Sequence, residues 1–150
     1  MSDLAGDGCY RPTLILADDS GIILDALEKL LRRDYDIVAA VRDGAALVEA
    51  AARLRPDVIV ADMNMPCLTG LDALRRLKAD GLDVKFVLLT IDGDPALAAE
   101  VFQAGGLAYL MKHSATEELP VAIQEVLRGA RYLTPRIVLD GTSITPTDNR

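Results

Sequence analysis

The sequence predicts an α/β fold, a doubly wound parallel sheet covered by helices on both faces. Short apolar runs alternate five times with segments whose apolar residues recur at helical spacing. These runs are continuous, as in parallel strands that helices bury on both sides. The chain has 150 residues, 51% hydrophobic and 26% charged, which suits one folded domain and excludes a disordered chain.

The first half of the chain predicts two strand–helix pairs. The run 14–17 indicates a strand, and Ser20 can cap the helix that follows it. Apolar residues recur in that helix at i, i+4, i+7 and i+8, which predicts one inward face: Ile23, Leu27, Leu30 and Leu31. A second strand is predicted over 36–40. The second helix begins after Asp43 and ends before Pro56.

The second half predicts three more pairs. Their strands cover 58–61, 84–89 and 107–110. The third helix is closed by Gly81. The fourth begins at Asp94, with a proline in its first turn. The last begins at Ser114 or Thr116 and ends at Gly129.

The two ends of the chain differ from this pattern. We expect residues 1–10 to form a flexible N-terminus, 11–131 the folded domain and 132–150 a linker or tail rich in Thr, Pro, Gly and Asp. Residues 145–148 have the composition of a helix start, yet the chain stops two residues later. This suggests that the sequence was cut, although a disordered tail would look the same.

Charge and composition exclude several functions. The chain has 16 Lys and Arg against 23 Asp and Glu, a net charge of −7, which argues against DNA binding by its own surface. No apolar run is long enough to span a bilayer, and no signal peptide is visible, so no membrane partner is expected. The only cysteines are Cys9 and Cys67, which favours a reducing compartment and a cytoplasmic protein.

Polar side chains follow four of the five strands: Asp18 and Asp19, then Asp62, Thr90 and Lys112. Ligands bind at this edge of open parallel sheets. Three converging carboxylates repel one another unless a cation such as Mg²⁺ lies between them. Lys112 and Thr90 can then meet an anion bound to that metal. Each residue alone would be an ordinary cap or turn residue, but together they describe a phosphoryl-transfer pocket with a carboxylate nucleophile.

Four segments carry a resemblance: Ile15-Leu16-Ala17-Asp18-Asp19-Ser20, the stretch from Asp62-Met63-Asn64-Met65-Pro66 to Gly70, Leu88-Leu89-Thr90, and Ala108-Tyr109-Leu110-Met111-Lys112. Over residues 11–131 the sequence resembles the receiver domain of bacterial two-component response regulators. The resemblance implies a flavodoxin-like (βα)5 fold with a five-stranded sheet in the order 2-1-3-4-5.

The resemblance also implies roles for the site residues. Asp62 would accept a phosphoryl group from a sensor histidine kinase. Asp18, Asp19 and Asp62, with the main-chain carbonyl of Asn64, would bind Mg²⁺. Lys112 would neutralise the phosphoryl oxygens.

A switch is implied as well. Thr90 would turn inward to hydrogen-bond the phosphoryl group, and Tyr109 would follow it between outward and inward rotamers. Phosphorylation adds roughly −1.5 to −2 charge and shifts a pre-existing equilibrium between two states. The surface of the fourth helix, fifth strand and fifth helix would change, and with it a homodimer or partner contact.

The pattern of residues 105–135 and the helix start at Thr145 look most like regulators of the NarL/LuxR type. In these, a receiver precedes a DNA-binding domain with a helix-turn-helix. The resemblance therefore implies control of transcription, with DNA bound only through an output domain that this chain does not contain.

Four residues depart from the family pattern or stand beside the site. Ile91 follows Thr90, where the family usually has a small residue, and predicts slow phosphorylation and slow phosphate loss. His113 follows Lys112 and is interpreted as a solvated loop residue. Pro120 removes a backbone donor early in the last helix. Cys67 is interpreted as an inert small residue.

Other functions fit less well. A hydrolase with an aspartyl intermediate needs a proton carrier for the leaving group, and Asn64, two residues after Asp62, is not one. We therefore expect no turnover enzyme, only slow autodephosphorylation. A stand-alone receiver, or a protein-binding module that is never phosphorylated, remains the alternative. Flavin binding lacks a phosphate loop after the first strand.

Overall fold

A single parallel sheet organises the chain. The computed structural model describes residues 11–134, 138–139 and 142–143. The sheet has the order β2-β1-β3-β4-β5-β6, and every neighbouring pair is parallel. Its strands are β1 (Thr13–Ala17), β2 (Asp36–Val41), β3 (Val58–Asp62), β4 (Lys85–Thr90), β5 (Ala108–Met111) and β6 (Tyr132–Leu133). The predicted order 2-1-3-4-5 is confirmed.

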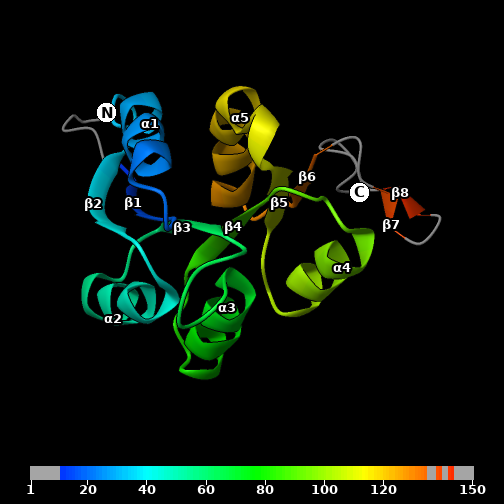
Figure 1. Ribbon diagram of the computed structural model, residues 1–150, viewed down its shortest axis with the longest axis horizontal. Helices are drawn as coiled ribbons and strands as arrows, with labels where there is room; N and C mark the ends of the chain where they lie inside the picture. The colour runs from blue at the N-terminus through cyan, green and yellow to red at the C-terminus, as the bar shows by residue number, and fades with distance from the viewer. Residues whose placement is uncertain (1–10, 135–137, 140–141, 144–150) are drawn as a thin grey trace.

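Helices cover both faces of the sheet. They are α1 (Gly21–Leu31), α2 (Gly44–Leu54), α3 (Gly70–Ala79), α4 (Pro95–Gln103) and α5 (Ala115–Leu127), with a short 3₁₀ turn, η2 (Lys112–Ser114), before α5. Figure 1 shows α1 and α5 on one face and α2, α3 and α4 on the other. Of the described helices, none is long and apolar enough to cross a bilayer.

Alternate residues of each strand fill two separate cores. In β1, Leu14 and Leu16 pack on the side of α1 and α5, whereas Ile15 packs on the side of α2, α3 and α4. All three side chains are fully buried. Burial on both faces is why the strands are continuous apolar runs, as the sequence predicts.

Helix starts follow the predicted caps. The side chain of Ser20 accepts a hydrogen bond from the Ile23 amide at 3.3 Å, and that of Asp43 accepts one from the Ala46 amide at 2.7 Å. Asp94 caps α4 in the same way, with a proline at the first helical position. These caps fix where each helix leaves the carboxyl edge of the sheet.

A sixth strand extends the five that were predicted. β6 follows the last helix and pairs with β5 through two residues, with Ala108 opposite Tyr132 and Tyr109 opposite Leu133. Two residues are too few to carry a strand period, so the sequence gives no signal for it. β6 lies in the stretch 132–150 that is predicted as a linker or tail. Further along, β7 (Val138–Leu139) and β8 (Thr142–Ser143) form an antiparallel pair.

Some predictions lie outside the described residues. These are the flexible N-terminus over 1–10, with Cys9, and the helix start at 145–148. The predicted domain limits 11–131 stay a prediction.

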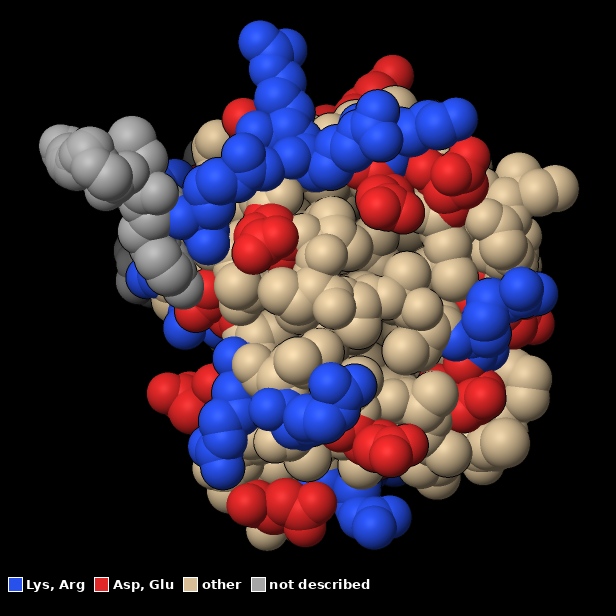
Figure 2. Space-filling model, turned by 90° about the vertical axis from the view of Figure 1, so that its left-hand side faces the viewer, with Lys and Arg blue, Asp and Glu red and all other residues tan. Residues whose placement is uncertain are grey.

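The two edges of the sheet are unequal. β2 is an edge strand of six residues, whereas β6 has two. In β2, Ile37, Val38 and Ala39 are half-buried and Ala40 is exposed. Figure 2 views this side of the molecule and shows an uncharged centre bordered by Lys and Arg interspersed with Asp and Glu. The β2 edge is thus apolar and is bordered by side chains of both charges.

Candidate functional site

Three aspartates meet at the carboxyl ends of β1 and β3. Asp18 follows the last residue of β1, and Asp62 is the last residue of β3, the neighbouring strand. Asp18 is fully buried and Asp62 is 3% exposed, whereas Asp19 is exposed. One carboxylate oxygen of each lies within 4.8 Å of the others. The predicted acidic cluster is therefore assembled by the sheet order.

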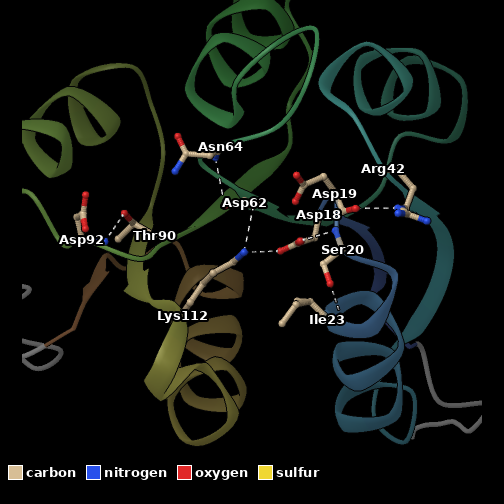
Figure 3. Close-up of polar contacts among 10 residues, drawn as sticks. All are labelled: Asp18, Asp19, Ser20, Ile23, Arg42, Asp62, Asn64, Thr90, Asp92 and Lys112. Atoms are coloured by element: carbon tan, nitrogen blue, oxygen red, sulfur yellow. Dashed lines mark hydrogen bonds and ion pairs between the residues drawn. The ribbon is translucent and has the colours of Figure 1, made fainter.

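Lys112 joins two of these carboxylates. It is the first residue of η2, directly after β5, and its Nζ lies 2.9 Å from Asp18 Oδ2 and 3.1 Å from Asp62 Oδ2. Figure 3 shows the side chain reaching across the ends of the strands to lie between both aspartates. The ammonium group thus compensates part of the buried negative charge.

The second oxygen of each carboxylate is held by backbone. The Ser20 amide donates to Asp18 Oδ1 at 2.9 Å, and the Asn64 amide donates to Asp62 Oδ1 at 3.1 Å. Both are side-chain-to-backbone turns that span two residues. Each carboxylate is therefore fixed from two sides, by an amide of its own loop and by Lys112.

Burial and ion pairing shift the pKa values of Asp62 and Lys112. Burial raises the pKa of Asp62 and outweighs the Asn64 amide and the Lys112 ammonium, which lower it. Burial alone would lower the pKa of Lys112, but its hydrogen bonds and ion pairs with Asp18 and Asp62 outweigh burial and raise that pKa. Lys112 therefore keeps its proton near neutral pH, while ionised Asp62 is held at a cost.

The donor set fits a hard divalent cation. Three carboxyl groups face one ammonium group here, so acidic groups outnumber basic ones in a small volume. Carboxylate oxygens are the ligands that Mg²⁺ prefers, with water or phosphate oxygens completing its coordination. Asn64 lies beside Asp62 in the following loop, as Figure 3 shows. Its predicted role through the main-chain carbonyl stays a prediction.

Thr90 ends the next strand, β4, beside the cluster. It is 3% exposed, and its hydroxyl oxygen accepts a hydrogen bond from the Asp92 amide at 3.3 Å. Figure 3 shows this contact within the loop after β4. Thr90 thus lies at the predicted edge, with its oxygen held by its own loop.

Tyr109 is buried completely in β5. It packs in the core on the side of α2, α3 and α4, opposite Leu88 of β4. Burial raises the pKa of its hydroxyl. The structure therefore shows an inward side chain, and the predicted movement between two rotamers stays a prediction.

Other singled-out residues lie around this edge. His113 is exposed in η2, which agrees with a solvated residue. Ile91 is 65% exposed, and its predicted effect on phosphorylation stays a prediction. Pro120 lies inside α5, which continues through it to Leu127. Cys67 is exposed, with a φ of 73°.

Sequence reasoning misses Arg42. Its Nε donates to the backbone carbonyl of Asp19 at 3.0 Å, and Figure 3 shows the guanidinium beside that residue. A β-carbon at Gly21 would lie 3.4 Å from an Arg42 terminal nitrogen, so the guanidinium also covers the start of α1. The available signal was a basic residue directly after the second strand, at the same edge as the aspartates.

The doubly wound sheet and the acidic cluster at its carboxyl edge agree with the outcome of a comparison with known families. Residues 14–124 match the response regulator receiver domain. The chain belongs to this family.

Individual relatives refine the comparison. The transcriptional regulatory protein LnrK of Bacillus subtilis (strain 168) is 31% identical over 126 residues, covering 83% of this chain and 57% of LnrK. The nitrate/nitrite response regulator protein NarP of Escherichia coli (strain K12) is 32% identical over 126 residues, covering 83% of this chain and 59% of NarP. A LuxR-family two-component response regulator from Aurantimonas sp. SI85-9A1 superposes with a TM-score of 0.79 at 29% identity, covering 85% of this chain and 93% of that structure.

These relatives confirm the resemblance to the NarL/LuxR type. The chain spans less than two thirds of the length of the curated relatives it matches first. Its match is therefore to their receiver part.

Proposed function

We propose that Asp62 accepts a phosphoryl group from a sensor histidine kinase and that its new charge switches a protein-binding surface. One observation carries the proposal: Lys112 bridges Asp18 and Asp62 within a cluster of three carboxylates whose oxygens lie within 4.8 Å. This arrangement offers a nucleophile, a cation site and a fixed positive charge at one point.

The residues divide the chemistry of transfer. A carboxylate oxygen of Asp62 attacks phosphorus, the bond from phosphorus to the donor nitrogen breaks, and the electron pair leaves with the donor imidazole. Mg²⁺ bound by Asp18, Asp19, Asp62 and the Asn64 carbonyl would supply charge neutralisation for the phosphoryl oxygens. Lys112 keeps its proton and turns from Asp62 Oδ2 toward a phosphoryl oxygen.

The switch uses the neighbouring strands. The Thr90 hydroxyl, whose oxygen now accepts from the Asp92 amide, turns to donate its hydrogen to the phosphoryl group. Tyr109 lies on β5, the strand next to Thr90, and its core position responds to that movement. The surface of α4, β5 and α5 then changes, which favours a homodimer or another partner.

The output is proposed from the relatives. LnrK is called a transcriptional regulatory protein, and this chain spans about half its length. We infer that the chain controls transcription from the cytoplasm and that DNA is bound through an output domain outside these residues. The net charge of −7 agrees with a receiver that does not bind DNA itself.

The direct test is phosphorylation by a small donor. The chain is incubated with Mg²⁺ and acetyl phosphate, and intact mass spectrometry followed by peptide mapping locates the label. We expect a gain of about 80 Da on Asp62, as covalent phosphoryl transfer requires. Asp62→Asn loses the label, while Asp72→Asn, an exposed acid in α3 outside the cluster, keeps it. No label, or a label elsewhere, contradicts the proposal.

A further inference from the structure

We infer that Thr134 is a positioning residue for Lys112, acting through the backbone of Met111. The inference rests on the proposed phosphoryl transfer. Thr134 follows β6 and is 2% exposed. Its hydroxyl oxygen accepts a hydrogen bond from the Met111 amide at 2.9 Å, and Met111 directly precedes Lys112.

The contact completes the outer edge of β5. β6 pairs with β5 only at Ala108 and Tyr109, and the Thr134 amide adds one further bond to the Tyr109 carbonyl at 3.2 Å. The Met111 amide therefore has no strand residue of β6 opposite it. The Thr134 hydroxyl takes that place, so a side chain holds the last residue of β5.

A partly buried hydrogen-bond network fixes the Thr134 hydroxyl. Its hydrogen is donated to Glu118 Oε1 of α5 at 3.0 Å, which leaves a lone pair for Met111. The same Glu118 oxygen accepts from the Tyr132 hydroxyl at 2.9 Å. Every donor in this network is used once, so the direction of the Thr134–Met111 bond is set.

This geometry bears on the site because the end of β5 is where Lys112 begins. Met111 lies opposite Thr90 in the β4–β5 register, and the next residue sends its ammonium to Asp18 and Asp62. Loss of the Thr134 bond leaves a partly buried amide unpaired and frees this end of the strand. A small displacement there misplaces the charge that meets the phosphoryl group.

The test compares three variants of this chain. Thr134→Val keeps the shape and removes the hydroxyl. Thr134→Ser keeps the hydroxyl. Tyr132→Phe is the matched control, because it removes another bond to the same Glu118 oxygen and leaves the Thr134–Met111 bond in place.

Two quantities are measured: the rate of labelling by acetyl phosphate in Mg²⁺, and hydrogen exchange of the Met111 amide. We expect Thr134→Val to slow labelling roughly fivefold, as loss of one hydrogen bond does, and to accelerate exchange at Met111. Thr134→Ser restores both. Tyr132→Phe lowers thermal stability but labels at the parental rate.

The outcomes separate the two proposals. If Thr134→Val labels as fast as the parent chain, or if Tyr132→Phe slows labelling as much, the positioning role is wrong while the proposed function stands. A parent chain that takes no label overturns the proposed function and this inference with it.

Discussion

At the scale of single residues, Asp62 holds a negative charge where the fold makes it costly. Burial raises its pKa even though an amide and Lys112 both contact it. The carboxylate is therefore poised for a partner that removes charge repulsion, whether a cation or covalent modification.

This cost predicts that Asp62→Asn stabilises the fold in Mg²⁺-free buffer. A raised pKa means that the native state binds the Asp62 proton more tightly than the unfolded state. The contribution of Asp62 to stability is thus greatest at low pH and is lost as the pH rises through the unfolded and then the raised native pKa. We expect Asp62→Asn to melt a few degrees above the parent at pH 7, with the gap closing as the pH falls.

Melting curves of both proteins across this pH range check the prediction, since other titrating groups cancel in the difference. Asp72→Asn, which replaces an exposed carboxylate outside the cluster, is measured beside it as the control. A lower melting temperature for Asp62→Asn at pH 7 would mean that its pairing with Lys112 outweighs burial.

Residue types at strand ends are visible in the sequence, whereas their bonds are not. Asp18, Asp62 and Lys112 are predicted together because the carboxyl ends of parallel strands share one edge. That Lys112 bridges both aspartates depends on side-chain reach, and the contact of Arg42 with Asp19 depends on a loop conformation. Neither contact corresponds to a residue spacing that can be recognised in the sequence.

At the scale of elements, α3 begins against β3, the strand that ends in Asp62. The Gly70 amide donates to the Met63 carbonyl at 3.0 Å, and a β-carbon at Gly70 would lie 2.4 Å from the Asp62 carbonyl oxygen. Such an approach is possible only without a side chain. Glycine at this position therefore lets the helix start within contact of β3.

Gly70→Ala is predicted to destabilise the fold by about 2 kcal/mol, because backbone on both sides must shift. It also slows labelling, since the Asp62 backbone moves. The control is Gly21→Ala at the start of α1, whose β-carbon meets only the flexible Arg42 end at 3.4 Å. Urea unfolding measures the stability of the parent, Gly70→Ala and Gly21→Ala. Equal stability of the parent and Gly70→Ala would show that α3 can shift away from β3 with little loss of stability.

Helices and strands are predicted correctly where burial produces an apolar pattern over many residues. The five apolar runs and the caps at Ser20, Asp43 and Asp94 match the observed starts within a residue or two. β6 and η2 escape prediction because two or three residues carry no period. They are held by tertiary contacts, such as the Thr134–Glu118 bond, that only the folded chain provides.

At the scale of the whole molecule, the acidic cluster exists only in the folded chain. Asp18, Asp19 and Asp62 come from two strand ends that meet only in the native state. A cation that binds this cluster binds the folded chain alone and shifts the unfolding equilibrium.

Mg²⁺ is therefore predicted to stabilise the folded chain and raise its melting temperature. At a Mg²⁺ concentration of 100 times the Kd, the free energy of unfolding rises by roughly 2.7 kcal/mol. Asp19→Asn loses this dependence at little cost to the fold, because Asp19 is exposed. Asp25→Asn, an exposed acid of α1 outside the cluster, retains it. Thermal melts at increasing Mg²⁺ measure the effect; an equal response of Asp19→Asn and the parent would place the cation elsewhere.

The unequal edges of the sheet also bear on how copies of the chain avoid one another. A strand from a second molecule can extend a sheet only along an unpaired rim. β6 offers two residues there and β2 offers six, so intermolecular strand addition is confined mainly to β2. Side chains of both charges border the uncharged centre on that side of the molecule in Figure 2, and charged residues near an edge strand are one means by which proteins oppose strand addition.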